Sequence, residues 1–182
     1  MHYACRRPAK TIQEGVMMDF SLINPRQTVL VTSRGKARIL GQEKHKDNCI
    51  AVDWHMPGSF KPFLYLISIG LGRFSYKLIK ESGVFAVNFM PIEYASQVLF
   101  CGRQSGEFMD KITQAGLVAR DASKIDCPVI EESAGWLECR VIQEIACGDH
   151  AVFVGEVVAE TNNSKGLRRV FHTEGDDFST IQ

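Results

Sequence analysis

The segment at residues 70–75 (Gly-Leu-Gly-Arg-Phe-Ser) combines the residue types that bind a phosphate group. It follows an apolar run at residues 63–69 and precedes a segment with helical character. Glycines let the backbone approach a ligand closely, and the first turn of a helix presents unpaired N–H groups and a positive dipole end. Arg73 and the Ser75 hydroxyl would add donors suited to phosphate oxygens. The segment predicts an anion site, and an ordinary turn before a capped helix is the alternative left open.

The same residues do not complete a dinucleotide-binding fingerprint. A G-x-G-x-x-G motif needs a third glycine where Ser75 stands. Its acidic partner, about 20 residues further on, would fall after the break at Met90 and Pro91. Because no second strand–helix–strand unit follows, a Rossmann site is not expected.

A second candidate site lies in residues 48–62, at the end of a predicted strand and in the segment after it. Functional groups concentrate at such positions. The polar and aromatic side chains gathered here are Asn48, Cys49, Asp53, Trp54, His55 and Ser59. The alternative left open is an amphipathic strand with Trp54 in the core.

His150 is the third candidate, because it begins a predicted strand directly after a turn at Gly148 and Asp149. An imidazole with an ordinary pKa of about 6.5 suits proton transfer at a cleft. A structural histidine with satisfied hydrogen bonds is the alternative here.

Other chemistries find no support in the sequence. His45, His55 and His150 have no metal-ligand spacing, and the six cysteines include no CxxC pair, so no metal site is expected. No G-x-S-x-G motif is present, which excludes an esterase-type serine elbow. Without a signal peptide, the cysteines are expected to be free thiols in a reducing cytoplasm.

The candidate residues require a scaffold of strands with helices inserted between them. Strands are predicted at residues 28–33, 48–54, 63–69, 84–90, 136–145, 151–160 and 167–172, with a hairpin turn at 147–149. Helices are predicted at 75–82, 93–101 and 106–115, the first with Ser75 as N-cap and Gly83 as C-terminal stop. Glu107 and Lys111 are spaced for an i,i+4 ion pair. Residues 55–62 are predicted to be a loop because of their prolines and glycine. This order favours a mainly β fold with inserted helices, a β-barrel, over a parallel α/β sheet.

Length and composition predict a single domain over residues 19–182, preceded by a flexible tail at 1–18. Hydrophobic residues at 45% and charged residues at 23% indicate a globular protein. The formal net charge is zero, which argues against nucleic acid as a partner, although residues 1–46 hold nine Lys or Arg and only three Asp or Glu. No apolar run reaches the roughly 20 residues of a membrane helix, so no membrane partner is expected.

The order of several motifs along the chain resembles the flavin reductase-like family, and within it the flavoredoxin branch. The matching segments are residues 24–33 (NPRQTVLVTS), Asn48, 54–57 (WHMP), 70–75 (GLGRFS), 79–88 (IKESGVFAVN) and 148–157 (GDHAVFVGEV). Further matches lie at residues 101–111 and 137–139. Each motif is weak alone, but their common order extends from about residue 24 to residue 159.

The resemblance implies an FMN-binding split β-barrel that forms a homodimer, with FMN near the subunit interface. The residues that match the isoalloxazine-binding stretch are Asn48, Cys49, Ile50, Ala51, Val52, Asp53, Trp54 and His55. Those that match the phosphate-binding stretch are Ser68, Arg73, Ser75 and Tyr76. Asn88 matches the asparagine of a Phe-x-Val-Asn motif, and His150 matches a histidine near the face where a nicotinamide would stack.

The implied activity is that of an oxidoreductase in which NADH or NADPH passes hydride to N5 of FMN, with free flavin, ferric iron or a partner protein as final acceptor. Two alternatives remain open. One is a flavoredoxin-like electron-transfer protein without NAD(P)H activity. The other is a split-barrel binding module for another ligand, such as haem or a nucleotide.

Two features depart from the family pattern. Residues 34–47 form a basic link longer than the usual turn, which predicts an inserted hairpin or flap near the flavin. Cys49 stands where a small or apolar residue is expected, and its thiol is expected either to touch the flavin or to pack.

Overall fold

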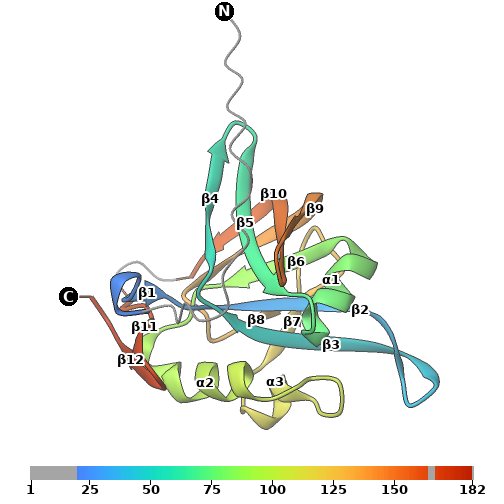
Figure 1. Cartoon of the computed structure of the whole chain (residues 1–182), viewed down its shortest axis with the longest axis horizontal. Helices are drawn as coiled ribbons and strands as arrows, with labels where there is room; N and C mark the ends of the chain where they lie inside the picture. The colour runs from blue at the N-terminus through green and yellow to red at the C-terminus, as the bar shows by residue number, and fades with distance from the viewer. Residues whose placement is uncertain (1–19, 164–166, 182) are drawn as a thin grey trace, which may run out of the picture.

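A seven-stranded antiparallel sheet forms the centre of the computed structural model, which describes residues 20–163 and 167–181 (Figure 1). Its neighbouring strands are β3 (Gln42–Val52), β2 (Val29–Ile39), β6 (Val84–Asn88), β9 (Gly135–Cys147), β10 (His150–Asn162), β5 (Phe63–Gly70) and β4 (His55–Phe60). All neighbours pair antiparallel. The fold is therefore mainly β, as the sequence predicts. The predicted tail at residues 1–18 lies outside the described residues.

Short helices and two small sheets complete the fold. The helices are α1 (Phe74–Ser82), α2 (Ala95–Arg103) and α3 (Lys111–Gln114), and 3₁₀ turns lie at Phe20–Leu22 and Ile92–Tyr94. One small sheet contains β1 (Arg26–Gln27), β11 (Phe171–Glu174) and β12 (Asp177–Ser179), and the other joins β7 (Ala119–Asp121) to β8 (Pro128–Ile130). In Figure 1, α2 and α3 lie below β2 and β3, while the β4–β5 hairpin projects upward. No helix in the described ranges is long and apolar enough to cross a membrane.

The first half of β2, residues 29–33, is buried on both faces, which explains the apolar run at its start. Successive side chains of a strand point to opposite faces. Val29 and Val31 pack into the main core with Phe153, whereas Leu30 packs with Val98 of α2 in a second cluster. The strand thus separates the core of the barrel from the layer formed by α2 and α3.

The prediction of a loop at residues 55–62 was wrong, because β4 occupies most of it. His55 pairs with Ile67 and Pro57 with Tyr65, and a register shift follows Pro57. β4 is an edge strand and needs backbone hydrogen bonds on one side only, so it tolerates a proline that lacks an N–H. The register shift absorbs the irregularity.

The three helices occur where they are predicted, but most of their first and last residues differ from the prediction. α1 begins at Phe74 with Arg73 at its N-cap, so Ser75 lies inside the first turn and does not cap it. Gly83 ends the helix in the left-handed conformation, as predicted, with its N–H bonded to the Ile79 carbonyl. Within the predicted helix at residues 106–115 only α3 is helical, and Asp110 caps it through the Thr113 N–H. The last predicted strand, residues 167–172, begins later, at β11.

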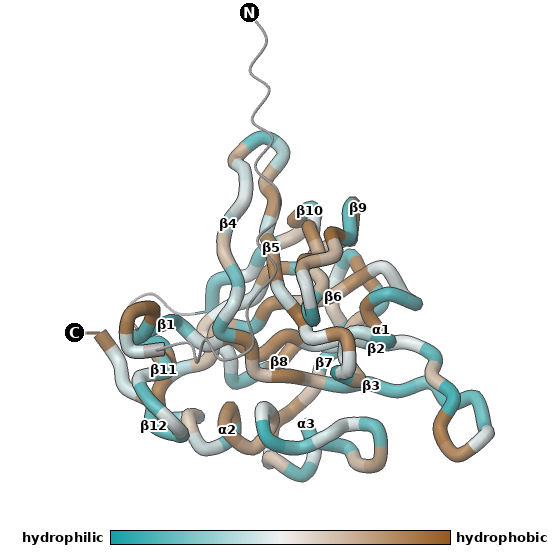
Figure 2. The backbone as a smooth tube through the Cα atoms, in the orientation of Figure 1, coloured by the Kyte–Doolittle hydropathy of each residue, from teal (hydrophilic) through white to brown (hydrophobic). Residues whose placement is uncertain are grey.

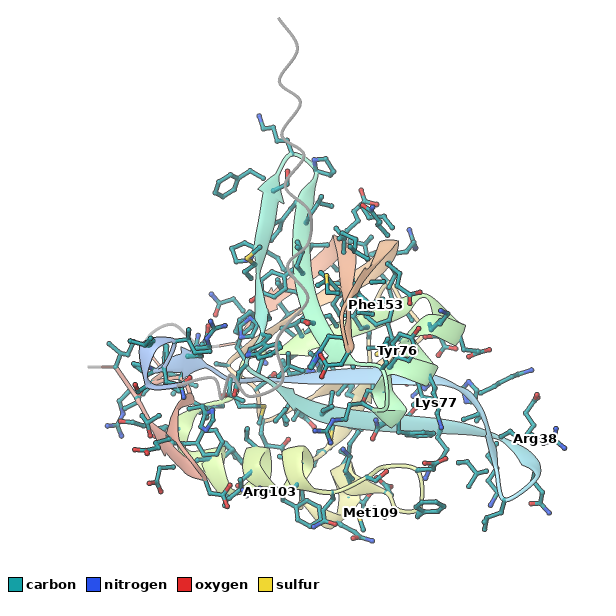
Figure 3. All side chains as sticks on the ribbon, in the orientation of Figure 1. Arg38, Tyr76, Lys77, Arg103, Met109 and Phe153 are labelled. Carbon is teal, nitrogen blue, oxygen red and sulfur yellow. The ribbon has the colours of Figure 1, made fainter. Side chains whose placement is uncertain are left out.

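The basic link at residues 34–47 is a hairpin, as predicted, formed by the continuation of β2 and β3 beyond the sheet. It turns at Leu40 (φ 49°) and Gly41 (φ 81°), the positive angles that a tight two-residue hairpin needs. Its outer half is mostly hydrophilic apart from the tip (Figure 2), and Arg38 lies near its far end (Figure 3). At its base, Arg34 pairs with Asp47 at 2.6 Å.

Candidate functional site

A groove runs between the end of β3, the end of β5, the start of α1 and the loop after α2. It consists of two adjoining pockets of about 170 and 200 Å³ that share Ile50, Arg73 and Gly102 in their walls. The other wall residues of the first pocket are Ala51, Val52, Asp53, Trp54, Ser68, Ile69, Gly70 and His150. Those of the second are Asn48, Gly72, Phe74, Ser75, Arg103, Gln104, Ser105, Gly106 and Lys111.

The second pocket gathers cations and hydrogen-bond donors. Arg73 and Ser75 lie at the first turn of α1, where backbone N–H groups lack helical partners and the helix dipole is positive. Asn48 Nδ2 donates to Ser75 Oγ at 2.7 Å, so the hydroxyl proton of Ser75 is available to a ligand. With the Lys111 ammonium in the same wall, these groups can bind a phosphate dianion.

Asn48 is held tightly between the groove and the loop after α2. Its side chain is buried, with 2% exposure, and its Oδ1 has no hydrogen-bond partner within residues 20–163 and 167–181. Gly106 lies directly against this oxygen, because a Cβ at position 106 would overlap the Asn48 amide. The glycine therefore lets the loop pack against the Asn48 oxygen, while the Asn48 nitrogen donates to Ser75 and orients its hydroxyl.

Lys111 reaches the groove from α3 and does not form the predicted surface pair with Glu107. Its ammonium, in a side chain only 4% exposed, donates to the Cys101 carbonyl at 2.8 Å and to the Gln104 carbonyl at 3.1 Å. These carbonyls belong to the last turn of α2, where helical partners are missing. Burial lowers the pKa of Lys111 below its usual value, while the nearby Cys49 and Cys101 oppose that shift.

A second lysine fixes the loop that forms this wall. The Lys46 ammonium from β3 donates to the carbonyls of Gly106 at 2.7 Å, Met109 at 3.2 Å and Glu107 at 3.3 Å. Residues 106–109 are thereby tied to the β2–β3 hairpin. The hairpin thus supports the groove wall from outside.

The first pocket is closed by Trp54 and His150. Their rings lie 4.8 Å apart between centroids, with planes inclined at 35°. His150 Nδ1 is 2.7 Å from Asp149 Oδ1, and this hydrogen bond lowers the pKa of the exposed Asp149 carboxyl. Gly70 lies beside the imidazole, since a Cβ built at this position would be in ordinary van der Waals contact with His150 Nε2, at 3.6 Å.

Asp53 is held in place by two partners from distant parts of the chain. Thr28 Oγ1 donates to its Oδ1 at 2.6 Å, and His172 Nδ1 lies 2.8 Å from its Oδ2. The carboxylate therefore joins β11 to the segment directly after β3, at the groove wall.

The structure brings together ten of the residues that the sequence predicts for the site. They are Asn48, Ile50, Ala51, Val52, Asp53, Trp54, Ser68, Arg73, Ser75 and His150. Four others lie outside the groove walls: Cys49, His55, Tyr76 and Asn88. Cys49 points to the opposite face of β3, where its sulfur contacts Cys101.

His55 and Asn88 are both engaged in internal hydrogen bonds. His55 Nε2 donates to the Gln27 carbonyl at 2.9 Å, and its Nδ1 accepts from the Tyr65 hydroxyl at 2.7 Å. Burial lowers the pKa of His55, which favours this neutral form. Asn88 is fully buried, donates to the Leu30 carbonyl and accepts from the Ile130 N–H.

Tyr76 points away from the groove along α1. Its hydroxyl donates to the Glu144 carboxylate at 2.8 Å and accepts from the Lys80 ammonium at 2.9 Å. Its ring lies near that of Phe153 (Figure 3), with 5.8 Å between centroids.

Sequence reasoning missed the wall made by residues 102–111. Lys111, Gly106 and the residues between Gly102 and Ser105 line the second pocket although they are distant in sequence from Arg73 and Asn48. The signal was present in the motif matches at residues 101–111, but it carried no assignment of role.

The sequence of the chain is similar to those of known proteins. Residues 21–176 match the family described as flavin reductase like domain. An uncharacterized protein of Archaeoglobus fulgidus is 38% identical over 117 residues, which cover 64% of this chain and 66% of that protein. The reductase component of a flavin-dependent trigonelline monooxygenase from Acinetobacter baylyi is 26% identical over 121 residues, which cover 66% of this chain but only 36% of that protein.

Solved structures share the whole fold. An FMN-binding protein from Thermus thermophilus superimposes with a TM-score of 0.78 at 22% identity, over 96% of both chains. The flavoredoxin of Desulfovibrio vulgaris (Miyazaki F) has a TM-score of 0.76 at 19% identity, over 95% of this chain and 93% of that chain. These likenesses confirm the predicted split β-barrel.

Proposed function

The chain belongs to the flavin reductase-like family, and on that premise we propose that it is an FMN-binding oxidoreductase that takes hydride from NADH or NADPH. The observation that carries the proposal is the donor cluster of Arg73, Ser75 and Lys111 at one end of an elongated groove. FMN has the matching shape, because it carries a terminal phosphate on a chain that leads to a flat ring.

The phosphate end of the groove fits a dianion by charge and by burial. Arg73 and Lys111 supply positive charge, and Ser75 is oriented by Asn48 with its proton available. Charge-assisted hydrogen bonds of this kind are roughly twice as strong as neutral ones. We therefore assign FMN phosphate binding to Arg73 and Ser75, with Lys111 as a nearby buried cation.

The other end of the groove fits an aromatic ring. Ile50 and Val52 supply apolar wall, Trp54 supplies an aromatic face, and Ser68 and Asp53 supply polar atoms. When bound, flavin supplies the hydride-accepting chemistry, and the protein supplies binding, orientation and electrostatics.

We assign His150 to the place where the donor meets the ring. Its imidazole lines the first pocket beside Trp54 and is oriented by Asp149. An imidazole so held can position a nicotinamide or donate a proton. Cys49, His55, Tyr76 and Asn88 keep packing or orienting roles in this proposal.

The proposal is tested by flavin titration followed by anaerobic reduction. Purified protein should bind FMN with micromolar or tighter affinity, measured by quenching of flavin fluorescence. Mixed with NADH or NADPH without oxygen, the complex should lose its yellow absorption band within the time of mixing or soon after. Protein that binds no FMN would overturn the proposal and would favour a split-barrel module for another ligand, such as haem or a nucleotide.

An electron-transfer role is the second candidate, because flavoredoxins share the fold over nearly the full chain. Such a protein would bind FMN equally well, but a partner protein would reduce it. FMN-loaded protein that stays yellow with both nicotinamides and bleaches with dithionite would favour this role. The final acceptor, whether free flavin, ferric iron or a protein, is then found by adding each to the reduced protein.

We also propose that the chain forms a homodimer, as the family resemblance implies. The exposed apolar side chains on β4 support this proposal, since Phe60 is 92% and Met56 is 56% exposed. Light scattering coupled to gel filtration should give twice the 20.4 kDa chain mass. A Phe60→Ser variant should shift the population toward the single chain, and a wild-type mass of one chain would contradict the proposal.

A further inference from the structure

Two fully buried cysteines meet beneath the groove. Cys49 of β3 and Cys101 of α2 are both 0% exposed, and their sulfurs lie 3.2 Å apart. A disulfide needs an S–S distance of about 2.05 Å, so the two sulfurs would have to approach by roughly 1.2 Å. The Cys49 thiol already donates a hydrogen bond to the Cys101 sulfur, so a shift of α2 toward β3 by this amount would bring the sulfurs to bonding distance.

The two thiols differ in their readiness to lose a proton. The hydrogen bond from Cys49 lowers the pKa of Cys101, and the charge of Lys111 lowers it further against the opposing effect of burial. The same hydrogen bond and burial raise the pKa of Cys49. Lys111 is fixed beside the pair, because its ammonium bonds to the Cys101 carbonyl at 2.8 Å. Cys101 is thus the nucleophilic member, since the thiolate is the reactive form.

The other described cysteines lack this arrangement. Cys127 and Cys139 are buried, and burial raises the pKa of both thiols, that of Cys127 to about 12. Cys147 is exposed beside the β9–β10 turn. Among the described residues, only Cys49 and Cys101 form a sulfur–sulfur hydrogen-bonded pair.

The groove brings solvent close to the pair. Asn48 and Ile50, which flank Cys49 in sequence, line the groove, and so does Gly102, which follows Cys101. The two thiols are themselves fully buried, so this wall is what separates them from hydrogen peroxide in the groove.

We propose that Cys49 and Cys101 form a redox-active dithiol that hydrogen peroxide converts to an intramolecular disulfide. The Cys101 thiolate attacks one peroxide oxygen, the O–O bond breaks, and the departing hydroxide takes up the proton released by Cys101 to become water. Cys101 is then a sulfenic acid. Cys49 sulfur attacks the Cys101 sulfur, the S–S bond forms, and the hydroxyl leaves with the Cys49 proton as a second water. The two thiols lose two electrons and two protons, and one peroxide is reduced to two waters.

The wild-type chain tests the proposal directly. Fully reduced protein is treated with hydrogen peroxide, quenched, unfolded and alkylated with a maleimide–polyethylene glycol reagent that adds a countable mass to each thiol. The untreated protein should show all six thiols, and the treated protein should lose two. Peptide mass analysis should find the Cys49 and Cys101 peptides joined. Retention of all six thiols, or a disulfide between other cysteines, would overturn the proposal.

Single substitutions separate the two roles. Cys49→Ser should leave Cys101 as a sulfenic acid, which dimedone present during unfolding captures, whereas Cys101→Ser should leave Cys49 unmodified at the same peroxide dose. Cys127→Ser is the matched buried control and should still form the disulfide. Capture at Cys49 in place of Cys101 would contradict the assigned roles. The wild-type crosslink decides the question if a variant does not fold, and it needs no flavin, so its result is independent of the proposed function.

Discussion

The Asn48 amide on β3 donates a hydrogen bond to the hydroxyl oxygen of Ser75 on α1, with 2.7 Å between the two atoms. Strand and helix are thereby joined at the point where the groove collects its cations. The bond sets the direction in which Ser75 can donate.

Ser75→Ala should therefore weaken FMN binding without unfolding the protein. A hydrogen bond to a charged group contributes about 1.5–3 kcal/mol, which corresponds to roughly a 10- to 100-fold rise in the Kd for FMN. Riboflavin, which has no phosphate, should bind equally well to both proteins. Fluorescence titrations with the two flavins measure this, and Ser96→Ala, at an exposed serine of α2, is the control.

Arg73→Ala should also weaken FMN binding and again spare riboflavin. The guanidinium supplies both charge and a fork of donors at the start of α1, so the Kd for FMN should rise at least about 10-fold. Arg73→Lys should recover part of the loss by restoring charge alone. Equal losses of affinity for FMN and riboflavin would show that Arg73 does not bind the phosphate, which would then lie in another part of the groove.

His150→Ala should slow the reduction of bound flavin by NADH or NADPH while FMN stays bound. General acid and positioning contributions are typically about 100-fold or more. Stopped-flow absorbance gives the rate. Asp149→Asn, which keeps the imidazole but weakens its orientation by Asp149, should give a smaller decrease. A rate unchanged in both variants would return His150 to a structural role.

Lys111→Met should reduce both stability and FMN affinity. The carbonyls of Cys101 and Gln104 would lose their buried donor, which destabilises the fold by about 1–3 kcal/mol. Urea unfolding measures the stability change, and flavin titration measures the affinity. Lys77→Met is the control, since Lys77 is exposed and pairs only loosely with Glu107 at 3.6 Å. A loss of stability in the control as large as in the variant would contradict the assignment.

Lowering the pH should destabilise the protein through protonation of His55, at pH values above those where the carboxylates are protonated. Burial lowers the pKa of His55 below the ordinary 6.5, so below pH 6.5 the unfolded chain takes up a proton that the folded chain resists. Stability should therefore fall as the pH drops from 6.5. The pKa values of the Glu138 and Asp110 carboxyls lie below their ordinary values of 4.5 and 3.8, so these groups do not titrate in the pH range where His55 does. The melting temperature should drop between about pH 6.5 and 5.5, and the drop should be smaller in His55→Gln.

The sequence predicts the site in two ways: local patterns predict the start of α1, and the family resemblance supplies Ser68 and the residues of β3. Residues 70–75 combine a strand end, glycines and a helix start, and each of these has a local signature. The wall at residues 102–111 has no such signature, because its place depends on Lys46 and Lys111 binding carbonyls distant in sequence. Local rules cannot anticipate those contacts.

The orientation of Cys49 could have been predicted from the sequence, whereas the strand β4 could not. The alternation of side chains along β3 sends Asn48 and Ile50 to the groove, so it requires Cys49 to face the other way. The edge position of β4 explains why Pro57 could be part of a strand, but the sequence alone does not identify an edge. Side-chain alternation along the strand decides the first case, whereas strand order, which arises from non-local pairing, decides the second.

The strand order also dictates when the groove can exist during synthesis. β5 pairs with β10 and with β4, and β10 separates β5 from the rest of the sheet. A nascent chain that has not yet emerged beyond β9 holds Arg73 and Ser75 but has no place to dock the β4–β5 hairpin. Its unpaired edge would then be open to other chains. The groove can therefore bind its ligand only late in folding, after β10 has paired with β5. A chain truncated before β10 should aggregate without having bound the cofactor.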